Sequence, residues 1–284
     1  MPVLDDHPSI PKAPADDQII WRFLTLEKLL HMILNGSLYF TQVLELQKDD
    51  PFESQFSSAH IIAIKTIMSD VEALKAFLRY ANKTEEIDLN DDRIKNQINM
   101  ALNIPMLEMF AKFAAGIHYV NCWHVNDFES AAMWRLYCSN HSGVAIKSTV
   151  GKLKKSIEDN ESDIYIGKIE YIDYRTEVIP TGNSFNTIFR KRLSFAHENE
   201  LRVCLVQLPE RLEGEENSAV YSFLDRNPKG IHLKCKMTEL IDEVVVSPLS
   251  QAWFTETIKG VLESLVPGLN VKKSDLFDPP NYAI

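Results

Sequence analysis

Two glutamates and an arginine occupy alternate positions in the segment 194–206, SFAHENELRVCLV. If this segment is a β-strand, Glu198, Glu200 and Arg202 share one face, because successive side chains of a strand point to opposite faces. Two carboxylates about 7 Å apart repel each other, which raises one pKa, while the neighbouring guanidinium keeps the other carboxylate ionised. We therefore predict Glu198 and Glu200 as catalytic candidates. A solvated strand edge with a structural ion pair is the alternative, because such pairs also shift pKa values.

Three cations, Arg190, Lys191 and Arg192, directly precede this strand. In an acidic chain, a basic cluster beside a polar cleft indicates a ligand that carries phosphate. Lysine and arginine also gather at the C-terminal ends of helices for purely structural reasons, and the sequence fits this explanation equally well. If the cluster serves a ligand that carries phosphate, we predict Lys191 and Arg202 as contacts of a bound cofactor.

An arginine also interrupts the first apolar strand, which is predicted over residues 19–24. A helix with one apolar stripe and an Asn-Gly stop follows, and a second strand is predicted over residues 37–42. Arg22 can share a cofactor site with Tyr39 and Thr41 of the second strand if the two strands are neighbours. The alternative for Arg22 is a structural carboxylate partner, because a buried charge must be paired in either case.

Five further residues are candidates for the same cleft: Asp50, Glu53, His124, Trp134 and Tyr137. Asp50 precedes a proline in the segment LQKDDPFE, so starting a turn or capping the next helix is its simpler role. Trp134 and Tyr137 lie at helical spacing, and such an aromatic stripe most often belongs to a core. His124 follows a cysteine at a spacing compatible with zinc, but no second pair accompanies them, so we predict no metal site.

The composition indicates an ordinary globular chain. Its 284 residues are 45% hydrophobic, which is ample for a core, and the formal net charge is -10. This charge argues against a general nucleic-acid binder, because such binding depends on basic surface. Four cysteines without CxxC spacing, behind a start that does not resemble a signal peptide, favour reduced thiols in the cytoplasm. No apolar run approaches the roughly 20 residues that span a bilayer, so we expect no membrane association.

The order of the predicted elements favours an α+β fold, with a mixed, largely antiparallel sheet of about eight strands. Residues 1–18 are rich in Pro, Asp and Ala, and we predict an extended arm. Residues 19–284 are predicted as a single domain, with a helical layer inserted over residues 57–115. The chain contains no GxGxxG, Walker loop or GxSxG, so the commonest nucleotide-binding and hydrolase motifs are absent.

A series of motifs resembles the bacterial family known as domain of unknown function 2971. The motifs run in order from Trp21 to the last predicted helix: WRFLTLEKLL, NGSLYF, DDPFE, VNCWHVNDFESAAMWRLY, HSGVAIK, IGKIEYIDY, KRLSFAHENELRV and DEVVVSP. The asparagine that usually precedes DPFE in this family is Asp49 here. The resemblance implies an architecture and candidate residues, but not a reaction.

The chain is also similar, more distantly, to the ADP-ribosyltransferase superfamily, which implies a fold of that kind and NAD as a substrate. The resemblance assigns Arg22 to the first-strand NAD contact, and Tyr39 and Thr41 to the second-strand position. It assigns Glu200 or Glu198 to the catalytic glutamate, which would stabilise an oxocarbenium-like state. The second strand lacks the Ser-Thr-Ser run of one class. The chemistry is coherent, because arginine can bind pyrophosphate through two hydrogen bonds and aromatic rings can stack on nicotinamide.

The leading hypothesis is therefore an NAD-dependent ADP-ribosyltransferase-like enzyme, of the kind found among toxins and antiphage defence effectors. It implies a nucleotide or dinucleotide ligand, a nucleic-acid or protein substrate, and an antitoxin or defence-system partner. The alternative is a non-catalytic ligand-sensing or protein-interaction module in which Arg22, Glu198, Glu200 and Arg202 form a structural ion network. A third hypothesis is a metal-dependent nuclease, with Mg²⁺ held by Glu198, Glu200 and Asp50.

Overall fold

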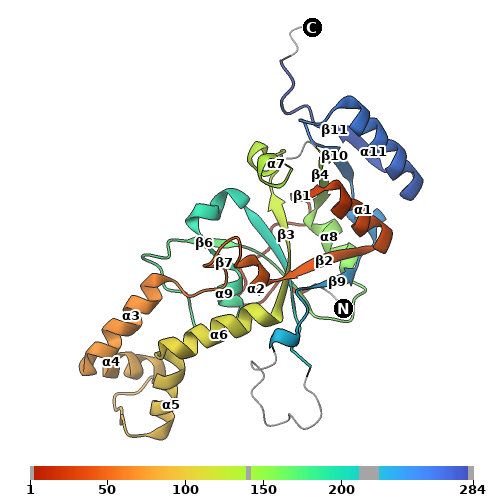
Figure 1. Cartoon of the computed structure of the whole chain (residues 1–284). Coiled ribbons are helices and arrows are strands. Elements are labelled where there is room, and N and C mark those ends of the chain that lie inside the picture. Colours follow the sequence, from red (N-terminus) through yellow and green to blue (C-terminus); the bar gives the residue numbers. More distant parts are fainter. Residues whose placement is uncertain (1–2, 139–141, 211–223, 281–284) are drawn as a thin grey trace.

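The computed structural model describes residues 3–138, 142–210 and 224–280. A nine-stranded sheet lies at its centre (Figure 1), and it confirms the predicted α+β class. Its strands are β1 (Ile19–Thr25), β2 (Ser37–Gln42), β3 (His118–Val125), β4 (Gly143–Thr149), β5 (Ile164–Lys168), β8 (Glu200–Val206), β9 (Gly230–Lys234), β10 (Glu243–Val246) and β11 (Asn270–Lys273). The strand order is β11-β10-β4-β1-β3-β2-β9, and β8 joins β3 to β5. All pairs are antiparallel except β10 with β11, so the sheet is largely antiparallel, as predicted.

Both faces of the sheet are covered, because apolar side chains alternate along its strands. One face carries Ile20, Leu201 and Val203 and packs against α1 (Leu26–Asn35), α8 (Val150–Ile157), α10 (Met237–Leu240) and α11 (Ala252–Leu265). The opposite face packs against α2 (Val43–Leu46), α6 (Ile104–Ile117), α7 (Ala131–Tyr137) and α9 (Phe185–Ile188). A strand with two apolar faces is therefore buried between two helical layers, which explains the doubly apolar patterns of the sequence.

The inserted helical region comprises α3 (Ser58–Ser69), α4 (Val71–Asn82), α5 (Asp92–Ala101) and α6. Side chains of Ser57, Asp70, Asp91 and Asn103 cap these helices at their N-termini, as expected for these residue types. The C-terminal part of α6 packs on the sheet, whereas α3, α4 and α5 project from one end of the molecule around a separate apolar cluster (Figure 1). Among the described residues, no single helix could cross a membrane by length and composition, although α5 and α6 together, bent by 60°, meet that test.

The N-terminal segment lies along the outer edge of β5. Leu4 forms a parallel bridge with Tyr165, and its backbone N–H donates to the carbonyl oxygen of Ile164 at 2.7 Å. Ile10 is buried and belongs to the apolar cluster under α9. The arm is thus extended at this edge and packed onto it.

The segment 194–206 is only partly a strand, which corrects the prediction from alternation. Leu193–Glu198 form a 3₁₀-helix, η1, and Asn199 adopts a left-handed conformation with φ of 39° before β8 begins. Asparagine tolerates this conformation better than most residues, and the turn it makes separates Glu198 from the strand. Glu200 and Arg202 do share a face of β8, whereas Glu198 reaches the same region from η1.

The three cations before this segment lie on a strand and not at the C-terminal end of a helix, which was the structural explanation for the cluster. Residues Arg190–Arg192 form the short strand β7, which pairs in parallel with β6 (Glu170–Ile172) in a separate two-stranded sheet. Alternation along β7 buries Lys191 and leaves Arg190 and Arg192 partly exposed. The cations therefore do not form one continuous basic surface.

The sheet is forked on one side of β3. Strand β1 pairs with β3 at His124 and Val125, whereas β2 pairs with it at Tyr119 and Val120. The three residues of β3 in between, 121–123, have no ladder partner on that side among the described residues. Strands β1 and β2 thus diverge from a common neighbour, and α1 joins their separated ends.

Two glycines allow a matched test of how Gly36 ends α1. Gly36 has φ of 54° and donates its N–H to the carbonyls of Ile33 and Met32 at the end of α1, whereas Gly260 lies exposed inside α11. We expect Gly36→Ala to lower the free energy of unfolding by about 1 kcal/mol, because a Cβ atom disfavours the left-handed conformation. Gly260→Ala should raise it by roughly 0.5–1 kcal/mol, because alanine is the better helix former. Urea denaturation measures both changes, and equal signs would contradict the assignment.

Candidate functional site

A cavity of about 750 Å³ opens where β1 and β2 diverge, within the range typical of small-molecule sites. Its walls come from β1, α1, β2, β3, α7, the end of η1 and the first residue of β8, with one residue each from α2 and β9. It brings together three residues of the predicted cofactor site, the predicted catalytic pair and two of the further cleft candidates: Arg22, Tyr39 and Thr41, then Glu198 and Glu200, then His124 and Tyr137. Arg22 and Tyr39 share this space although their strands are not paired, because both strands border the same fork.

Arg22 differs from the other charged residues of the cavity in the partners of its guanidinium group. Its guanidinium lies over the ring of Trp123, 5.7 Å from the ring centroid, at a distance where cation–π attraction operates. Its Nη1 atom is buried without a hydrogen-bond partner, and the described part of the chain provides no carboxylate within ion-pair distance. Burial lowers the pKa of Arg22 to about 10, so the side chain stays charged at neutral pH. The alternative explanation for Arg22 was an ion pair with a structural carboxylate, and no such carboxylate is found among the described residues.

Tyr39 forms an exposed aromatic wall at the side of β2. A Cβ atom at Gly230 would lie 2.0 Å from the Tyr39 hydroxyl oxygen, so the missing side chain at Gly230 lets the ring lie across β9. The ring of His232 lies 5.2 Å from that of Tyr39 and 5.1 Å from that of His31 on α1. The cavity therefore has a group of aromatic and imidazole rings on one side, suitable for contact with a planar ligand group.

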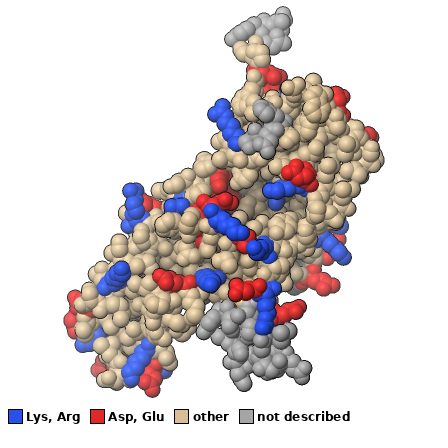
Figure 2. All heavy atoms as spheres, viewed as in Figure 1, with Lys and Arg blue, Asp and Glu red and all other residues tan. Residues whose placement is uncertain are grey.

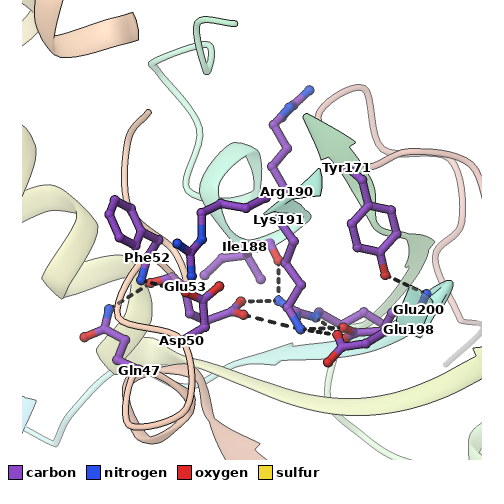
Figure 3. A network of polar contacts seen from close by, with 12 residues as sticks. Gln47, Asp50, Phe52, Glu53, Tyr171, Ile188, Arg190, Lys191, Glu198 and Glu200 are labelled. Carbon is purple, nitrogen blue, oxygen red and sulfur yellow. Dashed lines mark hydrogen bonds and ion pairs between the residues drawn. The ribbon is translucent and has the colours of Figure 1, made fainter. Parts of the chain in front are cut away.

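Glu200 also lines the cavity and is held by two cations. Its Oε1 accepts from Nε of Arg202 at 2.7 Å, and its Oε2 from Nζ of Lys191 at 2.9 Å. Lys191 also contacts Glu198 at 2.7 Å and Glu53 at 3.6 Å. Figure 3 shows Glu53 approaching this cluster from one side, and Glu198 and Glu200 from the other. The two predicted catalytic carboxylates thus converge on one ammonium group.

The charges of this network fix the ionisation of Glu200. Burial by itself raises the pKa of Glu200, but Arg202 and Lys191 lower that pKa by more, to well below its usual range. Burial likewise lowers the pKa of Lys191 and of Arg202, yet Glu200 and Glu53 outweigh it, and both pKa values are raised. Glu200 is therefore an anion that accepts hydrogen bonds, and it is unsuited to donating or taking up a proton near neutral pH.

Four predicted residues lie behind the cavity wall rather than in it. Arg202 is fully buried and also donates to Oε1 of Glu53 at 2.8 Å and to the carbonyl oxygen of Ile188. Asp50 is paired with Arg192, whose guanidinium lies 4.3 Å from the ring centroid of Phe52. The four residues, Glu53, Asp50, Lys191 and Arg202, form the contacts that hold Glu200 and the loop after α2 in place, and none of them lines the cavity.

The aromatic stripe of α7 divides between core and cavity. Trp134 is fully buried among Phe23 and its neighbours and donates from Nε1 to Glu129 at 2.9 Å, so it packs behind the wall. Tyr137, one turn later, lines the cavity, and burial raises the pKa of its hydroxyl. Trp134 thus belongs to the core, whereas Tyr137 lies at the cavity.

His124 lines the cavity with a defined tautomer. Its Nδ1 lies 2.6 Å from the carbonyl oxygen of Glu198, and a carbonyl only accepts, so Nδ1 carries the proton. Its Nε2 is buried without a partner among the described residues. Burial lowers the pKa of His124, which favours the neutral ring. His124 therefore positions Glu198 through its backbone and contributes no charge to the wall.

The carboxylates required by the nuclease hypothesis do not converge. Asp50 is bound to Arg192, whereas Glu198 and Glu200 are bound to Lys191. Among the residues that the structure describes, no group of three or more His, Cys, Asp or Glu side chains is arranged to hold a metal ion. Each proposed Mg²⁺ ligand already has a cation of the protein as its partner.

Several cavity residues had no signal in the sequence. Glu27, Lys28 and His31 of α1 lie in the wall, as does His232 of β9. His31 and His232 are 201 positions apart (232 − 31) and meet only because β9 pairs with β2 beside α1. The helical insertion, by contrast, contributes no residue to the cavity lining.

Residues 133–203 match the family described as Protein of unknown function (DUF2971). This match confirms the family resemblance. The DUF2971 segment extends from α7 into β8 and carries Tyr137, Lys191, Glu198, Glu200 and Arg202. It is shorter than the extent suggested by the motifs, and Arg22 and Tyr39 lie outside it. A search of curated proteins found no match.

Two arginines allow a test of how strongly the network contributes to stability. Arg202 is fully buried between two glutamates, whereas the Arg192 side chain is 30% exposed and pairs with Asp50. Arg202→Met should lower the free energy of unfolding by about 3–5 kcal/mol, because it leaves buried carboxylates without their partner. Arg192→Met should lower it by about 1 kcal/mol or less, because a partly exposed pair is screened by water. Chemical denaturation of both variants provides the comparison, and similar losses would contradict a buried network of this kind.

Proposed function

We propose that the cavity binds NAD and that the protein is an ADP-ribosyltransferase-like enzyme. The observation that carries the proposal is the half-buried Arg22, which has no counter-ion among the described residues and lines the same cavity as Glu200. A buried charge without a partner is unfavourable, so an anionic group of the ligand is the natural partner of this guanidinium. The pyrophosphate of a dinucleotide provides such a group, and arginine can bind it through two hydrogen bonds.

The remaining walls fit the other parts of the ligand. The rings of Tyr39 and His232 provide surfaces for a planar base or nicotinamide ring. Glu198 and Glu200 provide anionic oxygens for a ribose. A cavity of about 750 Å³ is of the size that accommodates a ligand of this class.

In the proposed reaction the bond between C1′ of the ribose and N1 of nicotinamide breaks. Nicotinamide leaves as a neutral molecule with the bonding electron pair, and positive charge develops at C1′ and the ring oxygen. The fixed anion Glu200 stabilises this oxocarbenium-like state electrostatically, since its cationic partners keep it ionised. An acceptor hydroxyl or amine then forms the new bond to C1′ and loses a proton. The acceptor class, nucleic acid or protein, is carried over from the superfamily resemblance alone.

A second candidate is a ligand sensor without catalysis. It is favoured by one observation: both oxygens of Glu200 are already engaged by Arg202 and Lys191. In this case Glu200 would be a structural member of the network, and Arg22 would still bind the anionic part of the ligand. The two candidates differ in turnover and not in binding, so separate experiments address them.

Binding is tested by calorimetric titration with NAD. We expect the wild-type protein to bind and Arg22→Met to lose at least tenfold in affinity, because the ligand anion loses its partner. Arg93→Met is the matched control, since Arg93 on α5 has a side chain that is 91% exposed and lies outside the cavity lining. Absence of binding to the wild-type protein would refute the proposal.

Turnover is tested by the release of nicotinamide from NAD, followed by chromatography. We expect Glu200→Gln to retain NAD binding and to lower the release rate about 100-fold or more, because the amide lacks the charge that stabilises the transition state. The melting temperature of the variant, with and without NAD, shows whether the fold is kept. Equal release by the variant and the wild-type protein, or no release by either, would favour the sensor.

A further inference from the structure

Five side chains form one buried ionic network behind and within the Glu200 wall, and their charges do not cancel. Glu53, Glu198 and Glu200 contribute three carboxylates, whereas Lys191 and Arg202 contribute two cations. In their ordinary charge states, three negative and two positive groups leave one negative charge. All five side chains are at most 15% exposed, so water screens this excess charge poorly.

Another part of the cavity lining, at Arg22, carries the reverse excess. Arg22 has no ion-pair partner among the described residues, and burial lowers the pKa of His124, which favours its neutral ring. The other cations and anions around the cavity, Lys28 and Glu27 of α1, offset each other. The cavity thus has a positive wall and a negative wall. Figure 2 shows acidic and basic side chains beside one another on the face in view, without a large area of one sign.

A cavity of this kind is matched by a ligand that carries an anionic group and a separate cationic group, because each then compensates one buried charge. The oxidised form of NAD has both, since its nicotinamide ring is a pyridinium and its pyrophosphate is anionic. In NADH the ring is neutral, so the negative wall would lack a partner. Discrimination between the two forms therefore depends on the excess charge of the network.

We infer that Glu53 is a specificity-determining residue that makes the cavity prefer NAD⁺ to NADH without touching the ligand. The inference rests on the proposed NAD binding. Glu53 is 1% exposed and lies outside the cavity lining, on the loop after α2. Its carboxylate forms ion pairs with the cations behind the wall, Arg202 at 2.8 Å and Lys191 at 3.6 Å. Figure 3 shows Glu53 beside Lys191. If Glu53 were uncharged, the charges of the other four groups would cancel, and the network would be neutral.

The test compares the dissociation constants of NAD⁺ and NADH for the wild-type protein and three variants by calorimetry. The wild-type protein should prefer NAD⁺, and Glu53→Gln should reduce this preference by on the order of tenfold. This magnitude follows from unit charges roughly 10 Å apart in a medium of effective dielectric constant about 20. Glu53→Asp retains the charge and should retain the preference, which separates charge from packing. Glu170→Gln removes a carboxylate that pairs with Arg190 outside the network and should also leave it unchanged.

The outcomes separate this inference from the function on which it rests. Equal affinities of the wild-type protein for NAD⁺ and NADH would overturn the inference and leave NAD binding intact. Binding of neither form would refute the proposed function itself. An unchanged preference in folded Glu53→Gln, or an equal loss in Glu170→Gln, would assign the preference to another part of the cavity. If Glu53→Gln fails to fold, loss of the preference in folded Glu53→Asp would overturn the inference.

Discussion

The buried guanidinium of Arg202 is the constraint on which the candidate site depends. A buried guanidinium needs acceptors, and three separate regions of the chain supply them to Nε and Nη1 of Arg202: Glu53 after α2, Ile188 at the end of α9, and Glu200 at the start of β8. Its Nη2 atom has no hydrogen-bond partner among the described residues. These contacts fix the loop that carries DPFE against the sheet. They also hold Glu200 at the cavity wall as an anion. The network links the position of a loop more than 140 residues away in sequence to the ionisation of the candidate catalytic group.

The cavity is formed by the way strands pair in the sheet rather than by loops. Strands β1 and β2 both pair with β3, at points separated by residues 121–123, and neither strand covers the backbone between these points. Asn121 compensates for part of this opening, since its side chain donates to the carbonyl oxygen of Tyr39 at 2.9 Å and accepts from Trp123. The same arrangement leaves room for Arg22 and Tyr39 to face a common space. A polar opening within a buried sheet is otherwise unfavourable, which supports a ligand-binding role for it.

Much of the fold could be predicted from local patterns, because alternation and helical stripes report directly on which side chains are buried. The α1 stop at Gly36 and the separate faces of Leu201 and Glu200 follow from residue type and spacing alone. Glu198 could not be placed in this way, because the left-handed Asn199 ends the extended conformation that alternation assumes. The cations before β8 were similarly ambiguous: the sequence shows a cluster, but pairing of β7 with β6 decides that each meets a different carboxylate.

The sequence by itself determined the α+β class, most of the sheet and helix segments, the family resemblance, and the residue types from which a site could be built. Only the tertiary structure decided which of these residues meet. Arg22, Tyr39 and Glu200 share a cavity, whereas Glu53 and Arg202 lie behind its wall and Trp134 belongs to the core. The physical reason is that secondary structure follows from interactions between near neighbours in the chain. The pairing of charges, by contrast, depends on strand register and on contacts between residues that are far apart in sequence.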